Sequence, residues 1–292
     1  MQRSGAPDAQ RRRACASLGA ALVVAALAGC APTPPPPAPA GIAVSVQQNR
    51  LDIARGKMTV VVHNGGASAV TLTSLVYADA RWASVLEWTG ALPVPAGRAR
   101  SVTADLMSPA CATSPTDVAG TAHLVFQTDR GAASDDYGVD DPFGFVARAA
   151  QQGCFASRFA ATAAVDLVDV AVVTGAGAAV AELTVRIVNH GAAPVRLDTV
   201  KSTTLLQPAA GGWLWEPAQV VAAGESVTVR LEAAPARCDL HAIAEDKVGT
   251  RFEAAVSVLS DPIDRGSLTL VASDPQRARL YDFVATTCGF AP

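Results

Sequence analysis

Apolar and polar residues alternate along most of the chain beyond residue 41. In one run, Val227, Val229 and Leu231 alternate with Thr228 and Arg230. A period of two over about five to eight residues is typical of a strand with one buried face. Turn sequences rich in glycine, asparagine and proline separate such runs at spacings of about ten residues, which predicts an antiparallel β-sandwich or barrel.

The same landmarks occur twice along the chain, in the same order. The partners are Asn64 and Asn189, Trp88 and Trp215, Gly97 and Gly224, Cys111 and Cys238, and Cys154 and Cys288. The distance between partners drifts only from 125 residues at the asparagines to 134 at the last cysteines. Self-similarity of this kind is the signature of a duplicated structural unit. We therefore predict two related domains, residues 41–160 and 161–292.

Each repeat is expected to end in a short helix. In the first, Asp141 can cap the helix, Pro142 suits its first position and Gly153 can end it. In the second, the corresponding residues are Asp274, Pro275 and Gly289, placed around residues 276–287.

The succession of strand, Asn-Gly turn, strand, Ala-Gly turn and strand resembles that of bacterial immunoglobulin-like domains. The likeness is one of pattern and carries no family motif. It implies a mainly β fold class, with two tandem immunoglobulin-like antiparallel β-sandwiches, each followed by its C-terminal helix.

The first 30 residues have the layout of an export signal. Arg3 and residues 11–13 are basic, and residues 14–28 form an apolar run without a charge. The run is shorter than the roughly 20 residues that span a bilayer as a helix. Residues 1–29 are therefore predicted to be a signal peptide.

The segment Leu27-Ala28-Gly29-Cys30 resembles the lipobox of bacterial lipoproteins. In that family the cysteine is lipidated on its sulfur, becomes the first residue after cleavage and is acylated on its new amine. The resemblance implies an exported protein that meets the membrane through lipid on Cys30, at the outer face of the cell membrane. An ordinary cleaved signal, an uncleaved anchor helix and a twin-arginine signal are the alternatives.

Residues 30–40 join the anchor to the first domain. Six of the eight residues 32–39 are proline, which lacks the backbone donor that helices and sheets need. Such a segment favours the extended polyproline II conformation. It is expected to act as a stalk that lifts the domains off the membrane.

Charge limits the partners that the chain can take. The whole chain has 23 Lys and Arg and 26 Asp and Glu. Residues 1–29 contain four Arg and one Asp, so the processed chain has 19 against 25, a net charge of −6. A nucleic-acid partner, which normally requires a clustered basic face, is not expected.

Four cysteines remain after removal of Cys15 and lipidation of Cys30. Four cysteines allow three pairings, and the duplication favours one bridge within each repeat, Cys111–Cys154 and Cys238–Cys288. Export places them in an oxidising compartment. Free buried thiols and a metal site are the alternatives, although the Cys-x-x-Cys spacing of zinc sites is missing.

The sequence shows few candidates for chemistry, and no cofactor is expected. Neither a zinc-protease motif, a nucleophile elbow nor a phosphate loop is found. His241 and Glu245 would share one helix face at a spacing of four and could hold a metal or polarise a water. They form the centre of an alternative reading as an envelope hydrolase or metal-dependent enzyme.

Two further groups are candidate binding residues. Four carboxylates fall within residues 135–141 and could bind calcium from one flexible loop, although a solvated loop is favoured; they are Asp135, Asp136, Asp140 and Asp141. Trp82 and Trp213 are tryptophans without an equivalent tryptophan in the other repeat, and exposed aromatic rings can stack on sugars.

Together these features favour a non-catalytic protein that acts in binding or assembly. Its partner would be an envelope protein or a glycan. The hydrolase centred on His241 and Glu245, and a glycan-binding module at Trp82 and Trp213, are the alternatives.

Overall fold

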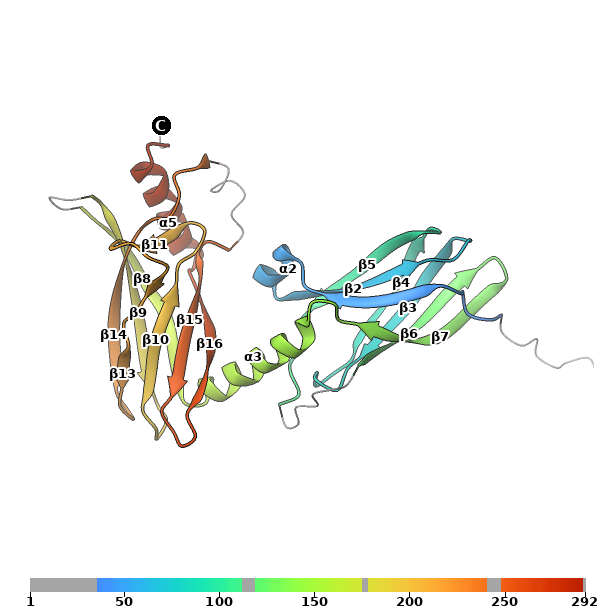
Figure 1. Ribbon diagram of the computed structural model, residues 1–292, viewed down its shortest axis with the longest axis horizontal. Helices are drawn as coiled ribbons and strands as arrows, with labels where there is room; N and C mark the ends of the chain where they lie inside the picture. The colour runs from blue at the N-terminus through green and yellow to red at the C-terminus, as the bar shows by residue number, and fades with distance from the viewer. Residues whose placement is uncertain (1–35, 112–118, 175–177, 241–247, 291–292) are drawn as a thin grey trace, which may run out of the picture.

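The computed structural model describes residues 36–111, 119–174, 178–240 and 248–290. Cys30, with the signal peptide, and the pair His241 and Glu245 lie outside these residues. Strands dominate the described chain, as the alternating pattern predicts, and they form two domains joined through one long helix (Figure 1).

The first domain contains one seven-stranded sheet in the order β4-β3-β6-β7-β1-β2-β5. Neighbouring strands are antiparallel except β1 and β7, which run parallel and pair Val44 with Val139. A short helix, α2 (Arg50–Arg55), connects β1 to β2. The strands are β1 (Ile42–Gln47), β2 (Lys57–Asn64), β3 (Val70–Ala78), β4 (Leu86–Val94), β5 (Arg98–Asp105), β6 (Gly120–Thr128) and β7 (Gly131–Asp140).

The second domain consists of two sheets. One has the order β12-β10-β15-β16, with β13 also paired to β10, and the other has the order β11-β14-β9-β8. The strands are β8 (Ala163–Val173), β9 (Val180–Asn189), β10 (Val195–Lys201), β11 (Leu206–Pro208), β12 (Leu214–Trp215), β13 (Gln219–Val221), β14 (Ser226–Pro235), β15 (Arg251–Val258) and β16 (Asp264–Val271).

The two domains share one strand order. In the first, β5-β2-β1 lies on one side of the β1–β7 junction and β4-β3-β6-β7 on the other; in the second, β14-β9-β8 and β12-β10-β15-β16 take these places, and β11 is an additional strand at the edge beside β14. Even an irregularity is repeated, because the register shifts between Leu72 and Ser74 in β3 and between Leu197 and Thr199 in β10. The predicted fold class, tandem immunoglobulin-like sandwiches, is confirmed.

A buried asparagine holds the same corner in both domains. Asn64 and Asn189 are each 1% exposed. The Asn64 amide nitrogen donates to the carbonyls of Ser68 and Val94, at 2.9 and 3.0 Å. The Asn189 amide donates to Ala193 and Val221, both at 3.0 Å. The repeated asparagine therefore provides a satisfied buried amide as well as a turn.

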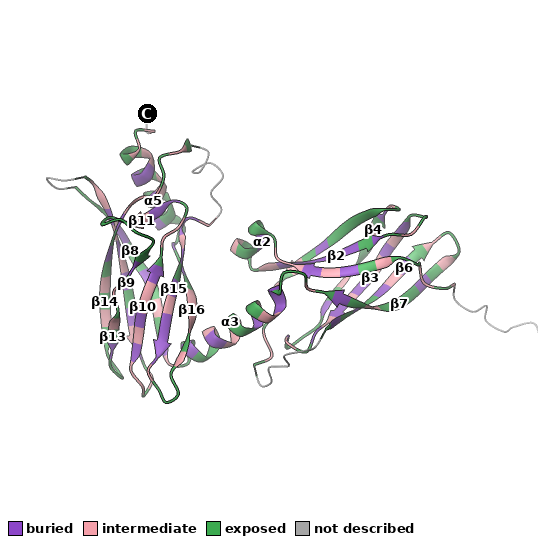
Figure 2. Cartoon of the chain, in the orientation of Figure 1, coloured by how far each residue is buried: buried purple, intermediate pink, exposed green. Residues whose placement is uncertain are grey.

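The helix α3 (Phe145–Ala160) belongs to both domains. Phe145 and Val146 pack in the core of the first domain, whereas Phe155 and Phe159 pack in the core of the second. Figure 2 shows buried positions along the helix where it meets each domain. The helix expected at the end of the first repeat is thus shared by both domains. It ends at Ala160, where the predicted first domain also ends.

The bounds of α3 differ from the expectation. The helix begins at Phe145, and the Asp141 carboxylate accepts hydrogen bonds from the amides of Phe145 and Val146 at 2.7 and 2.8 Å. Gly153 does not end the helix. A Cβ atom at Gly153 would lie 2.9 Å from Pro109 Cγ, so the glycine permits close approach of a neighbouring loop.

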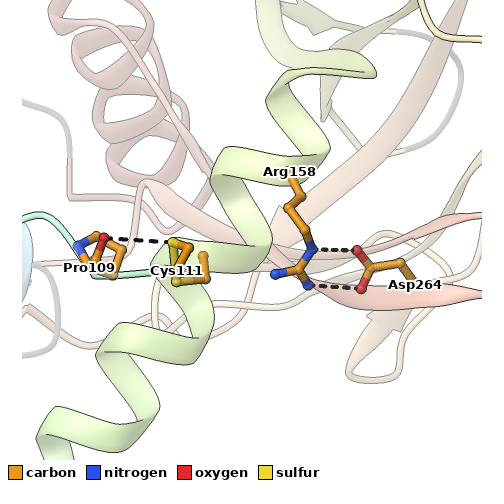
Figure 3. Close-up of a disulfide and its surroundings, with 5 residues drawn as sticks. Pro109, Cys111, Arg158 and Asp264 are labelled. Atoms are coloured by element: carbon orange, nitrogen blue, oxygen red, sulfur yellow. Dashed lines mark hydrogen bonds and ion pairs between the residues drawn. A yellow bond between two sulfur atoms is a disulfide. The ribbon is translucent and has the colours of Figure 1, made fainter. Parts of the chain in front are cut away.

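Both predicted disulfides are confirmed. Cys111 bonds to Cys154 on α3, and Cys238 bonds to Cys288 at the end of α5 (Asp274–Thr287). Arg158, also on α3, makes two hydrogen bonds to Asp264 of β16 in the second domain, at 2.9 and 3.1 Å (Figure 3). The helix is therefore bonded covalently to the first domain and by an ion pair to the second.

Candidate functional site

Trp213 is the most exposed large hydrophobic residue of the described chain, with 79% of its surface accessible. It follows Gly211 and Gly212, whose φ angles of 86° and 96° suit glycine. The strand β12 begins only at Leu214, so the alternation that would place Trp213 and Trp215 on one face does not extend to Trp213. Trp215 is 7% exposed, and its indole donates to the Glu232 carbonyl at 2.7 Å.

Trp213 borders a cavity of about 810 Å³ on the second domain. We name this cavity and its walls the Trp213 hollow. The walls come from β10, β11, β12 and β15 and from the segment after β14. Their charged and polar members are Lys201, Ser202, Thr203, Thr204, Gln207, Arg237, Arg251 and Glu253. The hollow therefore combines one exposed aromatic ring with several hydrogen-bonding side chains, as small-molecule sites do.

The hollow carries more positive than negative charge. Three of its four charged residues are cationic, although the whole chain has a formal net charge of −3. Lys201 pairs with Glu253 at 2.9 Å, and Arg237 pairs with Asp239 at 3.1 Å. Within the described residues no ion pair engages Arg251. Its guanidinium group is the cation best placed to meet an anionic ligand.

A row of side chains crosses the sheet from the hollow. Leu214 of β12 pairs with Lys201 of β10, Lys201 bonds across to Glu253 of β15, and Glu253 pairs with Thr269 of β16. Three strand spacings of about 4.8 Å make this row about 14 Å long. The row thus extends the hollow across one face of the second domain.

The row ends in a second cavity, a cleft of about 830 Å³ between the domains. Val248, Arg251 and Glu253 line both the Trp213 hollow and this cleft. The first domain contributes residues such as Gln48 and Ile53, and α3 crosses between the domains (Figure 1). The hollow and the cleft therefore share one wall.

The expectation of a sugar platform at both Trp82 and Trp213 is wrong for Trp82. Its ring is 5% exposed and belongs to the core of the first domain. An isolated bridge between Trp82 and Pro109 places it under the loop that leads to Cys111. Only Trp213 of this pair can offer a ring face to a ligand.

The expectation that the acidic residues 135–141 form a loop is wrong for most of them. Residues 131–140 form the strand β7, in which adjacent side chains point to opposite faces. Asp136 pairs with His123 at 2.7 Å, and Asp141 binds the first amides of α3. Across the described ranges, no three His, Cys, Asp or Glu side chains gather as metal ligands would.

The perturbed acids of the described chain lie in the first domain, away from the hollow. Asp79 is 7% exposed, and Arg81 donates to it from its Nε at 2.8 Å and from its Nη2 at 2.6 Å. Burial raises the pKa of Asp79, but the hydrogen bonds from Arg81 outweigh it and hold that pKa below its usual value. Burial and the Asp79 charge raise the pKa of Tyr77, which bonds to Asp79 at 3.2 Å. This network braces the core and adjoins no candidate catalytic group.

Sequence reasoning missed Lys201, Arg251 and Glu253. The alternation of β15 could have placed Arg251 and Glu253 together on an outer face. Their association with Trp213 could not be read from it, because Trp213 is more than 30 residues away along the chain. The structure does not test His241 and Glu245, which lie outside the described residues.

No family model matches the chain, and no curated protein matches it. Solved structures match distantly. A transglutaminase from red sea bream is 14% identical, with 80% of this chain and 31% of that chain covered and a TM-score of 0.22. The CupB2 chaperone of Pseudomonas aeruginosa is 10% identical over 75% of this chain and 93% of its own, with a TM-score of 0.19. A protein of unknown function from Porphyromonas gingivalis W83 is 14% identical over 78% and 99%, with a TM-score of 0.20.

The chain thus spans about a third of the length of that transglutaminase. Similarity at this level supports no conclusion about function. Within the described residues, no helix is long and apolar enough to cross a membrane. Two disulfides are typical of a protein folded outside the cytoplasm. The chain is a disulfide-bonded protein of two immunoglobulin-like β-sandwich domains, an architecture consistent with non-catalytic binding.

Proposed function

We propose that this protein is a lipid-anchored, exported binding protein that captures its ligand without catalysis at the Trp213 hollow. The exposure of Trp213 carries the proposal. Trp213 leaves 79% of its surface accessible beside a cavity, and exposed aromatic residues are enriched where proteins bind ligands. The other tryptophans are buried or half-buried and serve the two cores.

The lipobox at Cys30 supports the anchor, and the proline-rich segment supports a stalk. With two or more acyl chains on Cys30 the protein would be held stably at the membrane. The two domains would then stand outside the membrane. The second domain, which carries the Trp213 hollow, would be farther from the anchor along the chain than the first. A binding surface in that position can reach other components of the envelope.

Fractionation of the expressing cell tests both parts of the proposal. Cys30→Ser should release the protein from the membrane, and intact mass should show acyl chains only on the native chain. Trp213→Ala should stay on the membrane but lose retention of the protein's envelope ligand in pull-downs. Phe143→Ala is the matched control, because Phe143 is 64% exposed on the first domain. Equal retention by the Trp213 and Phe143 variants would refute the site.

A further inference from the structure

The chemistry of the Trp213 hollow narrows the ligand that it can take. The ring of Trp213 offers a flat apolar face, on which the C–H face of a sugar can lie. The walls add the Ser202 hydroxyl and the Gln207 amide, which can exchange hydrogen bonds with sugar hydroxyls. The Thr203 hydroxyl is not among them, because it donates to the Gly249 carbonyl at 2.7 Å and accepts from the amides of Leu205 and Leu206 at 3.2 and 3.1 Å.

The charges add a second requirement. Lys201 is already paired with Glu253, and Arg237 with Asp239, so these ion pairs fix the cationic side chains in place. Arg251 is half-buried in the wall that the hollow and the cleft share. A carboxylate can bind a guanidinium group with two parallel hydrogen bonds. The ligand should therefore carry carboxylates as well as sugar rings.

The shape adds a third requirement. The row of Leu214, Lys201, Glu253 and Thr269 runs from the hollow to the interdomain cleft. A single sugar ring would fill only part of this path, whereas a linear chain could follow it across the strands. The far end of the path is lined by Gln152 of α3 and by Gln48 of the first domain.

We propose that the Trp213 hollow and the interdomain cleft form one continuous site for a linear polysaccharide that carries carboxylate groups. This proposal rests on the proposed function and names the class of its ligand. One ring stacks on Trp213, a carboxylate binds Arg251, and the chain continues past Thr269 toward α3. An extended acidic polypeptide is the competing ligand class, and it is disfavoured because the one exposed aromatic ring in the hollow, that of Trp213, suits the C–H face of a sugar ring.

Binding of defined oligosaccharides to the mature, detergent-solubilised protein tests the proposal. The probes are short oligogalacturonates, neutral galacto-oligosaccharides of equal length and an oligo-aspartate peptide. We expect the uronate probe to bind on the order of tenfold more tightly than the neutral probe, because only it can engage Arg251. Equal binding of the two sugars, or tighter binding of the peptide, would overturn the proposal while leaving the Trp213 site intact.

Matched variants assign each contact. Arg251→Gln should remove the preference for uronate, whereas Arg265→Gln, an exposed arginine at the start of the neighbouring strand β16, should keep it. Trp213→Ala should weaken both sugars by about tenfold, and Phe143→Ala should weaken neither. Unchanged sugar binding by Trp213→Ala would overturn the proposed function together with this inference.

The length of the ligand tests the path to the cleft. Longer oligogalacturonates should bind more tightly than short ones until the path is filled. Gln152→Trp places a large side chain in the cleft, on the exposed side of α3. This variant should abolish the gain from length and leave the binding of the shortest probe unchanged. A gain from length that survives in Gln152→Trp would overturn the continuous site.

Discussion

The two domains have corresponding strand orders, but they differ at the edge strand that pairs with β3 in the first domain and with β10 in the second. In the first domain β4 is an unbroken strand of nine residues, and Leu86 at its start is 5% exposed. In the second domain the same part of the chain is divided between the short strands β12 and β13. Trp213, the counterpart of Leu86 in the repeat, lies in the preceding turn and is 79% exposed. Shortening one edge strand has thus turned a core position into a surface one.

The domains also differ where their two sheets meet. In the first domain, backbone pairing of β1 with β7 joins the two halves into one seven-stranded sheet. Among the described strands, the equivalents β8 and β16 form no ladder, and α5 packs beside β8. Gln276 of α5 is 5% exposed and donates to the Leu167 carbonyl at 3.1 Å, which satisfies a backbone group of β8. The two halves of the first domain are therefore joined by a ladder, whereas β8 and β16 of the second pack side by side without pairing and α5 covers the β8 side.

Removing the disulfides should have the largest effect on this comparison. The bridges close loops of 43 and 50 residues in sequence separation. Chain entropy predicts a loss of up to about 4 kcal/mol in the free energy of unfolding for each Cys→Ser pair. Chemical denaturation of the Cys111/Cys154 and Cys238/Cys288 variants would measure it. A much smaller loss at Cys238/Cys288 would show that the buried face of α5 holds that helix without its bridge.

The repeated asparagine corner should give an intermediate effect. Asn64→Ala and Asn189→Ala each leave two buried or half-buried carbonyls without their donor, at an expected cost of about 1–3 kcal/mol. The hydrogen bonds are matched in the two domains, so the two costs should agree. Denaturation followed by hydrogen exchange in each domain would compare them. Clearly unequal costs would show that the corners, although alike in geometry, are not equivalent in energy.

Acid should have the smallest effect, and it should act on the first domain. The pKa of Asp79 is lower in the folded chain than in the unfolded one, where it is about 3.9. Its contribution to stability is therefore present above about pH 4 and is lost as the pH falls through the folded pKa. The second domain has Thr204 at the corresponding position. As the pH falls, hydrogen exchange should show the first domain losing protection at a higher pH than the second. Asp79→Asn should remove this difference between the domains.

The sequence alone was sufficient for the strands, the shared strand order and the disulfide pairing. Alternation reports which face of a strand is buried, and it needs no knowledge of distant residues. The repeat of Cys111 and Cys154 as Cys238 and Cys288 decided among the possible pairings, since related domains keep related bridges. The sequence also singled out Trp213, as a tryptophan without an equivalent in the other repeat, and its role in binding stays a prediction.

Only the tertiary structure decided how the elements share their contacts. The sequence predicts a helix end at Gly153, yet Gly153 lies inside α3, and its missing side chain leaves room for Pro109. Trp82 reads as unpaired and available, yet it is buried in the first core. The ion pair of Arg158 and Asp264 joins residues 106 apart. Local patterns encode which side of an element is apolar, whereas the partner of that side depends on chain segments that no local window contains.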